Sequence, residues 1–134
     1  MVATHGRFAE GIINSFQMIL GKQENFSVLC AYAGEEEEAL EKVVRKIVME
    51  RKADKDLIII TDLFGGSVNN EFMKYLNVPG VYLITGLSLP LLLELYANQE
   101  REIKEMIRLS IMSAQSNLKF CNELLKEGEN EEEF

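Results

Sequence analysis

Three polar residues have the types and positions needed for group-transfer chemistry: His5, Asp62 and Ser67. His5 is the single histidine of the chain and follows a short strand-like run at residues 1–4, while Asp62 comes just after the continuously apolar run at residues 57–60. A carboxylate that accepts a hydrogen bond from one imidazole nitrogen fixes the tautomer and leaves the lone pair of the other nitrogen outward as a nucleophile. The pair therefore predicts a histidine that accepts a phosphoryl group.

A second set of groups is suited to binding the incoming phosphate. Gly65, Gly66 and Ser67 follow Asp62 and lead into a predicted helix. The backbone amides of Gly66 and Ser67 at the helix start, together with the Ser67 hydroxyl, are predicted to stabilise the charge on a phosphoryl group. Glycine at this point lets the backbone approach a ligand closely.

Each of these residues also has a purely structural interpretation. A lone histidine at a strand end is more often a hydrogen-bonded structural residue, and Gly-Gly-Ser before a helix is often a turn with its N-cap. The functional interpretation gains weight because His5, Asp62 and Ser67 fall independently at the ends of predicted elements. Residues 85–88 follow a further strand and are expected at the same edge of the sheet.

Strands and helices are predicted to alternate along the chain. Strands are expected at residues 1–4, 26–32, 57–60 and 81–85, and helices at residues 8–20, 35–48, from Ser67, from Pro90, and over the last amphipathic segment at residues 103–125. This order predicts an α/β fold, a doubly wound, mainly parallel open sheet of four to five strands with helices on both faces. If the first and third strands are neighbours, the backbones of His5 and Asp62 lie about 4.8 Å apart. Ligands of such sheets bind beyond the carboxyl ends of the strands.

Length and composition narrow the function further. The 134 residues are expected to form a single domain over residues 1–125, followed by an acidic tail at residues 126–134. A net charge of −8 disfavours nucleic acid and anionic membrane surfaces as partners. Cys30 and Cys121 show no spacing typical of a metal or redox site, and no apolar run is long enough to span a bilayer. A cytoplasmic protein is expected.

Four segments give the sequence a family resemblance. They are Thr4-His5-Gly6 with Phe8-Ala9-Glu10-Gly11, Gly21-Lys22-Gln23-Glu24-Asn25, Asp62-Leu63-Phe64-Gly65-Gly66-Ser67 with Asn70, and residues 86–90. Over nearly its whole length the chain resembles the enzyme IIA component (EIIA) of the mannose/fructose/sorbose family of the bacterial phosphoenolpyruvate-dependent sugar phosphotransferase system. The chain departs from that pattern in its short first strand and in Val68 and Ser88, where proline and asparagine are common.

The resemblance implies a role for each of these groups. His5 would take a phosphoryl group from the histidine-containing phosphocarrier protein and pass it to a separate IIB protein, which phosphorylates sugar entering through membrane permease subunits. Asp62 would hydrogen-bond the histidine and Ser67 would lie by the phosphate. The resemblance also implies a protein-histidine phosphotransferase without a metal or soluble cofactor, and a homodimer. Phe64, Leu87 and Leu89 are expected to form an exposed apolar rim that docks the carriers.

Other classes of protein place similar residues at such positions. The phosphotransferase subunit of dihydroxyacetone kinase resembles the same fold and also uses an early histidine. Histidine phosphatases and mutases need an arginine before the histidine and a second histidine, whereas this chain has Thr4 and no other histidine. A receiver domain would phosphorylate Asp62, but it needs acidic residues at the first strand end and a lysine on a later strand, where this chain has Thr4-His5 and Thr85.

Overall fold

The computed structural model describes residues 1–34 and 38–127. The chain forms two compact units, one at Met1–Leu89 and the other from Pro90 onward. A single functional domain over residues 1–125 stays a prediction. The acidic tail predicted at residues 126–134 lies outside the described residues from residue 128.

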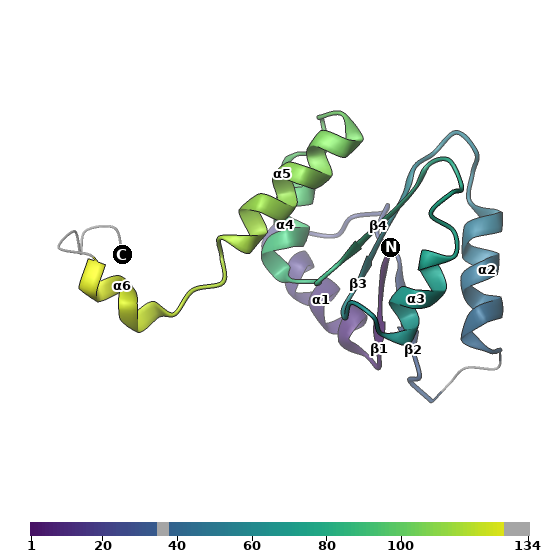
Figure 1. Cartoon of the computed structure of the whole chain (residues 1–134), viewed down its shortest axis with the longest axis horizontal. Helices are drawn as coiled ribbons and strands as arrows, with labels where there is room; N and C mark the ends of the chain where they lie inside the picture. The colour runs from purple at the N-terminus through teal and green to yellow at the C-terminus, as the bar shows by residue number, and fades with distance from the viewer. Residues whose placement is uncertain (35–37, 128–134) are drawn as a thin grey trace. The chain divides into compact units, whose positions relative to one another are not determined.

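The first unit is built around a parallel sheet. Its strands are β1 (Val2–His5), β2 (Val28–Ala31), β3 (Leu57–Thr61) and β4 (Val81–Thr85), in the spatial order β2-β1-β3-β4. All three strand pairs are parallel, with Thr4 beside Cys30, Ala3 beside Thr61 and Ile59 beside Leu83. Figure 1 shows β1 and β3 side by side in the middle of the sheet. The predicted doubly wound α/β fold is confirmed, and the first and third strands are neighbours, which is the condition under which His5 and Asp62 were expected to meet.

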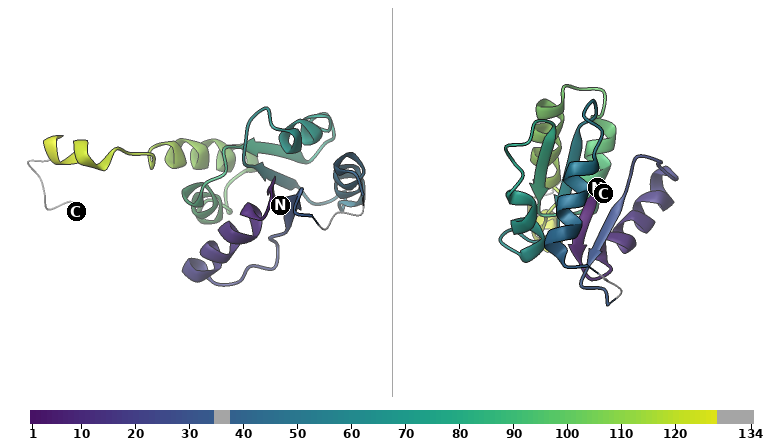
Figure 2. Two further views of the ribbon diagram at one scale, coloured as in Figure 1. Left: turned by 90° about the horizontal axis from the view of Figure 1, so that it is seen from below. Right: turned by 90° about the vertical axis from the view of Figure 1, so that its right-hand side faces the viewer.

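Helices cover both faces of this sheet. Helix α1 (Phe8–Leu20) packs against β1 and β2, while α2 (Leu40–Glu50) contacts α3 (Ser67–Met73) on the opposite face (Figures 1 and 2). The first connection runs from β1 to β2 at one edge of the sheet. The second runs from β2 past β1 to β3, and the third continues in the same direction from β3 to β4. Right-handed crossovers in opposite directions place their helices on opposite faces. The direction therefore changes between β1 and β3.

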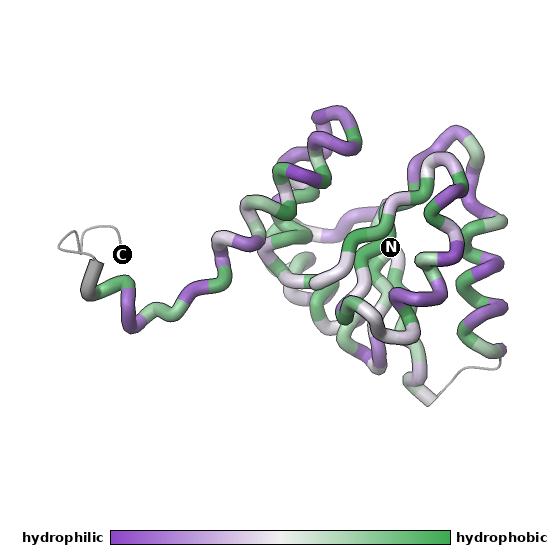
Figure 3. Tube along the Cα trace, viewed as in Figure 1, coloured by the Kyte–Doolittle hydropathy of each residue, from purple (hydrophilic) through white to green (hydrophobic). Residues whose placement is uncertain are grey.

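Apolar side chains on each face explain why these elements pack. Phe16 of α1 is fully buried, and its ring centroid lies 4.7 Å from that of Phe26. The core on the other face comprises Ala3, Ala31, Val44, Val48, Ile59, Val68, Phe72 and Val81. Figure 3 shows hydrophobic and hydrophilic residues alternating along α2, the pattern of a helix with one buried face.

The second unit is helical. It contains α4 (Leu89–Ala97), which begins at the end of the first unit, α5 (Ile103–Gln115) and α6 (Cys121–Glu127). The prediction of one helical segment over residues 103–125 is wrong, because residues 116–120 interrupt it. The side chains of Ser116 and Asn117 both donate to the Ser113 carbonyl, at 2.7 and 3.1 Å, and such bonds compete with helical backbone bonds.

Two other predicted boundaries differ from the structure. The second helix was expected from residue 35, but α2 begins at Leu40 with Ala39 in an extended conformation, and residues 35–37 lie outside the described residues. Strand β2 is shorter than the predicted residues 26–32 because Phe26 packs on Phe16 and Tyr32 turns out of the strand with a φ of 60°. None of the helices in the described part of the chain is long and apolar enough to cross a bilayer.

Candidate functional site

The carboxyl ends of β1 and β3 bring His5 and Asp62 together. The His5 backbone amide donates to Asp62 Oδ2 at 2.9 Å, and the ring Nδ1 lies 3.1 Å from Oδ2 and 3.2 Å from Oδ1. These contacts fall where the chain connections diverge to opposite faces, the usual position of ligand sites in open α/β sheets. One carboxylate thus fixes both the backbone and the ring of the histidine.

The two partners differ in exposure. The Asp62 side chain is 14% exposed and the His5 side chain 40% exposed. Desolvation raises the pKa of Asp62, but hydrogen bonds from the His5 amide and ring outweigh it, so the pKa lies below its ordinary value. Asp62 is therefore a carboxylate at neutral pH, and it accepts a hydrogen bond from the Nδ1–H of His5. This tautomer leaves the Nε2 lone pair of His5 available.

Ser67 faces that second ring nitrogen. Its Oγ lies 3.5 Å from His5 Nε2, at the long limit of a hydrogen bond. Ser67 is the first residue of α3, a position whose amide has no acceptor in the helical pattern. The Gly66 amide instead donates to the Leu63 carbonyl at 3.1 Å, so its predicted phosphate contact requires that this bond be shared or released.

Gly66 is needed here for space. Its φ of −72° is open to any residue, but a Cβ at this position would lie 3.0 Å from His5 Cε1 and 3.2 Å from the Leu63 carbonyl oxygen. The ring therefore lies directly against the glycine backbone. The second glycine of the Gly-Gly-Ser segment therefore provides the space that the imidazole ring occupies.

A buried polar network behind the site holds α3 in place. The Thr61 hydroxyl donates to Asn69 Oδ1 at 2.7 Å and lies 2.9 Å from Thr85 Oγ1. Asn69 and Thr61 are both almost completely buried. Sequence reasoning missed Asn69, although a polar residue on the inner face of a short helix is a usable signal. The network connects β3, β4 and α3, and so fixes Ser67 relative to Asp62.

The turn after His5 is also fixed by hydrogen bonds. Buried Thr4 accepts from the Ala9 amide at 2.8 Å through Oγ1, and the Gly6 amide donates to the Ala31 carbonyl at 2.7 Å. Gly6 has a φ of 58°, in the left-handed region that favours glycine. The Thr-His-Gly segment thus turns sharply from β1 into α1.

Tyr32 is a site residue that sequence reasoning missed. Its hydroxyl donates to Ser67 Oγ at 3.0 Å, and its ring centroid lies 5.9 Å from that of His5. It directly follows Ala31, the register partner of His5 on β2. A polar aromatic residue at the end of the second predicted strand was a usable signal in the sequence, because all parallel strands of the sheet end at the same carboxyl edge.

The predicted apolar rim is only partly present. Phe64 is 76% exposed, but Leu87 is buried, so the expectation of an exposed Leu87 is wrong. The amides of Gly86 and Leu87 both donate to the Thr61 carbonyl at 3.1 Å, which turns Leu87 inward. An open groove of about 390 Å³ runs beside the start of α1, lined by Phe8, Gly11, Ile12, Ser15, Ser88 and Leu89.

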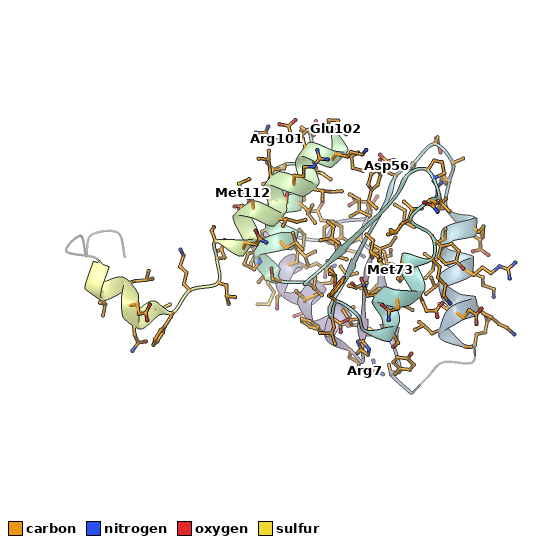
Figure 4. All side chains as sticks on the ribbon, in the orientation of Figure 1. Arg7, Asp56, Met73, Arg101, Glu102 and Met112 are labelled. Carbon is orange, nitrogen blue, oxygen red and sulfur yellow. The ribbon has the colours of Figure 1, made fainter. Side chains whose placement is uncertain are left out.

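The described residues contain no cluster of three or more histidine, cysteine or acidic side chains able to hold a metal ion. Figure 4 shows the two edges of the sheet, with Arg7 at the carboxyl edge and Asp56 at the opposite one. The site has a fixed carboxylate, an imidazole with one open nitrogen, and a hydroxyl beside it. This arrangement presents one imidazole nitrogen as a nucleophile beside a hydroxyl group.

Comparison with known proteins identifies the family of the chain. Residues 1–111 match the EIIA-man family, described as the fructose IIA component of the phosphotransferase system (PTS). The chain therefore belongs to this family, as an EIIA component of the mannose/fructose type.

Its relatives include proteins from several bacteria. The chain is 22% identical over 128 residues to the fructose-specific EIIA component of Bacillus subtilis (strain 168), covering 94% of this chain and 88% of that protein. It is 25% identical over 122 residues to the mannose-specific EIIAB component of Escherichia coli K12, covering 89% of this chain and 38% of that protein. The chain thus spans well under half the length of the E. coli relative.

Solved structures show the same fold. A protein from Klebsiella pneumoniae assigned to the phosphoenolpyruvate-dependent sugar phosphotransferase system as a permease has a TM-score of 0.89 and 40% identity, covering 92% of this chain and 90% of that one. A PTS IIA protein associated with the fucose utilization operon of Streptococcus pneumoniae has a TM-score of 0.71 and 30% identity, covering 92% and 93%.

Proposed function

We propose that this protein accepts a phosphoryl group on His5 Nε2 from the histidine-containing phosphocarrier protein and passes it to a IIB protein. One observation carries the proposal: Nδ1 of His5 is held by the Asp62 carboxylate at 3.1 Å, while Nε2 is directed toward Ser67 on a ring that is 40% exposed. An imidazole held in this way is a preorganised nucleophile. Membership of the EIIA-man family supports the role.

The chemistry requires one bond to form as another breaks. The Nε2 lone pair attacks the phosphorus of the donor's phosphohistidine, and the donor N–P bond breaks with its electron pair returning to the donor imidazole. The Nδ1 proton of His5 stays hydrogen-bonded to Asp62, and the negative charge of the carboxylate offsets the positive charge that develops on the imidazole ring as Nε2 bonds to phosphorus. In the second half, the IIB acceptor attacks the same phosphorus and the electron pair returns to Nε2.

Ser67 and Gly66 would form the binding site for the phosphoryl group that His5 carries. A phosphoryl group on Nε2 would place its oxygens beside the Ser67 hydroxyl, which can donate to one of them. The Ser67 amide at the start of α3 is a second donor. Gly66 leaves the space that the ring occupies.

The partner surface follows from exposed apolar residues near the site. Leu63 and Phe64 are 60% and 76% exposed in the loop that carries Asp62. Exposed apolar groups beside a reactive atom are typical of a docking surface. Phe64→Ala is expected to lower the rate of transfer from the phosphocarrier about tenfold without changing the melting temperature. Met112→Ala, at an apolar residue that is 66% exposed on α5, serves as the control. Unchanged transfer by the Phe64 variant would remove this docking role.

A reconstituted reaction tests the function. Phosphoenolpyruvate, enzyme I and the phosphocarrier are incubated with the native protein or with His5→Ala, and phosphate on the protein is measured. Acid-labile, base-stable label is expected only on the native protein. Label that persists in the variant would disprove His5 as the acceptor.

The acceptor decides between the two candidate functions. Phosphorylated protein is mixed with a purified IIB protein or with the dihydroxyacetone kinase subunit, and we expect transfer to IIB. Preferential transfer to the kinase subunit would favour that second function. The homodimer and the cytoplasmic location implied by the resemblance are tested by analytical ultracentrifugation and by cell fractionation.

A further inference from the structure

Tyr32 lies at the end of β2 with an unusual backbone conformation. Its φ of 60° is the only positive value at a non-glycine residue in the described chain. Bulky residues rarely adopt this left-handed conformation, because the Cβ approaches the neighbouring carbonyl. Such strain persists only where surrounding contacts hold it, and it concentrates at functional sites.

The turn directs the Tyr32 side chain to the reactive histidine. Ala31, the preceding residue, pairs with His5 in the sheet and accepts the Gly6 amide. The left-handed turn then brings the tyrosine ring to 5.9 Å from the imidazole, tilted by 34°. Tyr32 is 58% exposed, so burial of its ring does not explain the conformation.

The hydroxyl of Tyr32 makes one directed contact. It donates to Ser67 Oγ at 3.0 Å, and the same oxygen lies 3.5 Å from His5 Nε2. The Ser67 oxygen accepts a hydrogen bond from the Tyr32 hydroxyl. The hydrogen of the Ser67 hydroxyl therefore points away from Tyr32, toward His5 Nε2 or a group attached to that nitrogen. The order of groups is Tyr32, Ser67, His5 and Asp62.

We infer that Tyr32 is a positioning residue that orients the Ser67 hydroxyl toward the phosphoryl group on His5. This inference rests on the proposed phosphoryl-carrier function and extends it to a residue outside the His-Asp-Ser set. Tyr32 does not touch the reacting atoms, and it acts through Ser67. A preoriented hydroxyl stabilises the charge on the phosphoryl oxygens without reorganising during transfer.

A double-mutant cycle separates this role from simple packing. Tyr32→Phe retains the ring and removes only the hydroxyl, and it is compared in the native and Ser67→Ala backgrounds. The rate of phosphorylation by the phosphocarrier is expected to fall about fivefold in the native background, the value of one ordinary hydrogen bond. In the Ser67→Ala background the same substitution is expected to have no further effect, because its target is gone. Tyr82→Phe on β4 is the matched control.

A spectroscopic readout adds an independent measurement. The chain has no tryptophan and four tyrosines, so tyrosine fluorescence reports directly on these rings. Phosphorylation is expected to change the emission of the native protein and not that of Tyr32→Phe. Melting temperatures of all variants check that they are folded.

The possible results are distinguishable. If native protein is not labelled at all, the carrier function itself fails. If native protein is labelled and Tyr32→Phe matches its rate, Tyr32 has no positioning role. If the substitution slows transfer equally with and without the Ser67 hydroxyl, Tyr32 acts by another route and the inference is overturned.

Discussion

The two edges of the sheet in the first unit use polar groups in opposite ways. At the amino edge, Arg51 donates to the carbonyls of Lys52, Lys55 and Pro79, so a side chain ends on fixed backbone acceptors. At the carboxyl edge, the side chains of Tyr32, Ser67, His5 and Asp62 contact one another in series, and the His5 side chain within this series is 40% exposed. The bonds from Arg51 to backbone carbonyls hold loops together. The contacts between side chains at the carboxyl edge instead leave the Nε2 lone pair of His5 available for reaction. Substitutions at the carboxyl edge should therefore affect transfer, and those at the amino edge should affect stability.

The largest effect is expected from Asp62→Asn. An amide retains the shape of the carboxylate but cannot both accept the backbone amide and neutralise the imidazole, so the phosphorylation rate should fall roughly 100-fold. Rapid-quench labelling measures the rate, and Asp56→Asn at the amino edge is the control. A change of less than twofold for Asp62→Asn would contradict the role of the carboxylate.

The next effect is expected from Gly66→Ala. The added Cβ would meet His5 Cε1 at 3.0 Å, so the ring must shift and the phosphorylation rate should fall about tenfold. Gly11 has nothing within 4 Å of an added Cβ and lies in α1, so Gly11→Ala should stabilise the protein by about 0.5–1 kcal/mol without slowing transfer. Urea unfolding and labelling of both variants test the contrast. If Gly66→Ala and Gly11→Ala were phosphorylated at the same rate, Gly66 would not be needed for space.

Arg51→Ala should show the reverse pattern at the amino edge. Removing the guanidinium leaves several loop carbonyls without their donor, so the free energy of unfolding should fall by about 1–3 kcal/mol. The phosphorylation rate per folded molecule should stay unchanged. Exposed Arg45→Ala on α2 is the control. Slow transfer by a fully folded Arg51 variant would show that the two edges are coupled.

The smallest effect is expected from pH. The pKa of Asp62 is lower in the folded protein than the ordinary value of 3.8, so the carboxylate stabilises the folded state above that pH. This contribution is lost as the pH falls through the folded-state pKa. The difference in unfolding free energy between native protein and Asp62→Asn should therefore shrink below pH 3.8. A difference independent of pH would mean that the His5 contacts do not favour the charged form.

The sequence predicted the strand alternation, because apolar runs and their polar ends follow directly from burial in a parallel sheet. It predicted the pairing of His5 with Asp62 only on the condition that the first and third strands are neighbours, which the structure shows. It did not predict the positive φ of Tyr32, since the residue type favours a strand and the turn depends on contacts with His5 and Ser67. It also missed the break after α5, where Ser116 and Asn117 bond to the Ser113 carbonyl although the apolar periodicity continues. The buried position of Leu87 depends on the Thr61 carbonyl, a contact distant in sequence.

The most direct measurement of the central claim is the position of phosphorus on the imidazole. Protein labelled with ¹⁵N is phosphorylated by the phosphocarrier, and ¹⁵N–³¹P coupling is recorded in the His5 ring. Coupling to Nε2 is expected, with Nδ1 still protonated against Asp62. Coupling to Nδ1, or phosphate found on Asp62 or Ser67, would contradict the account.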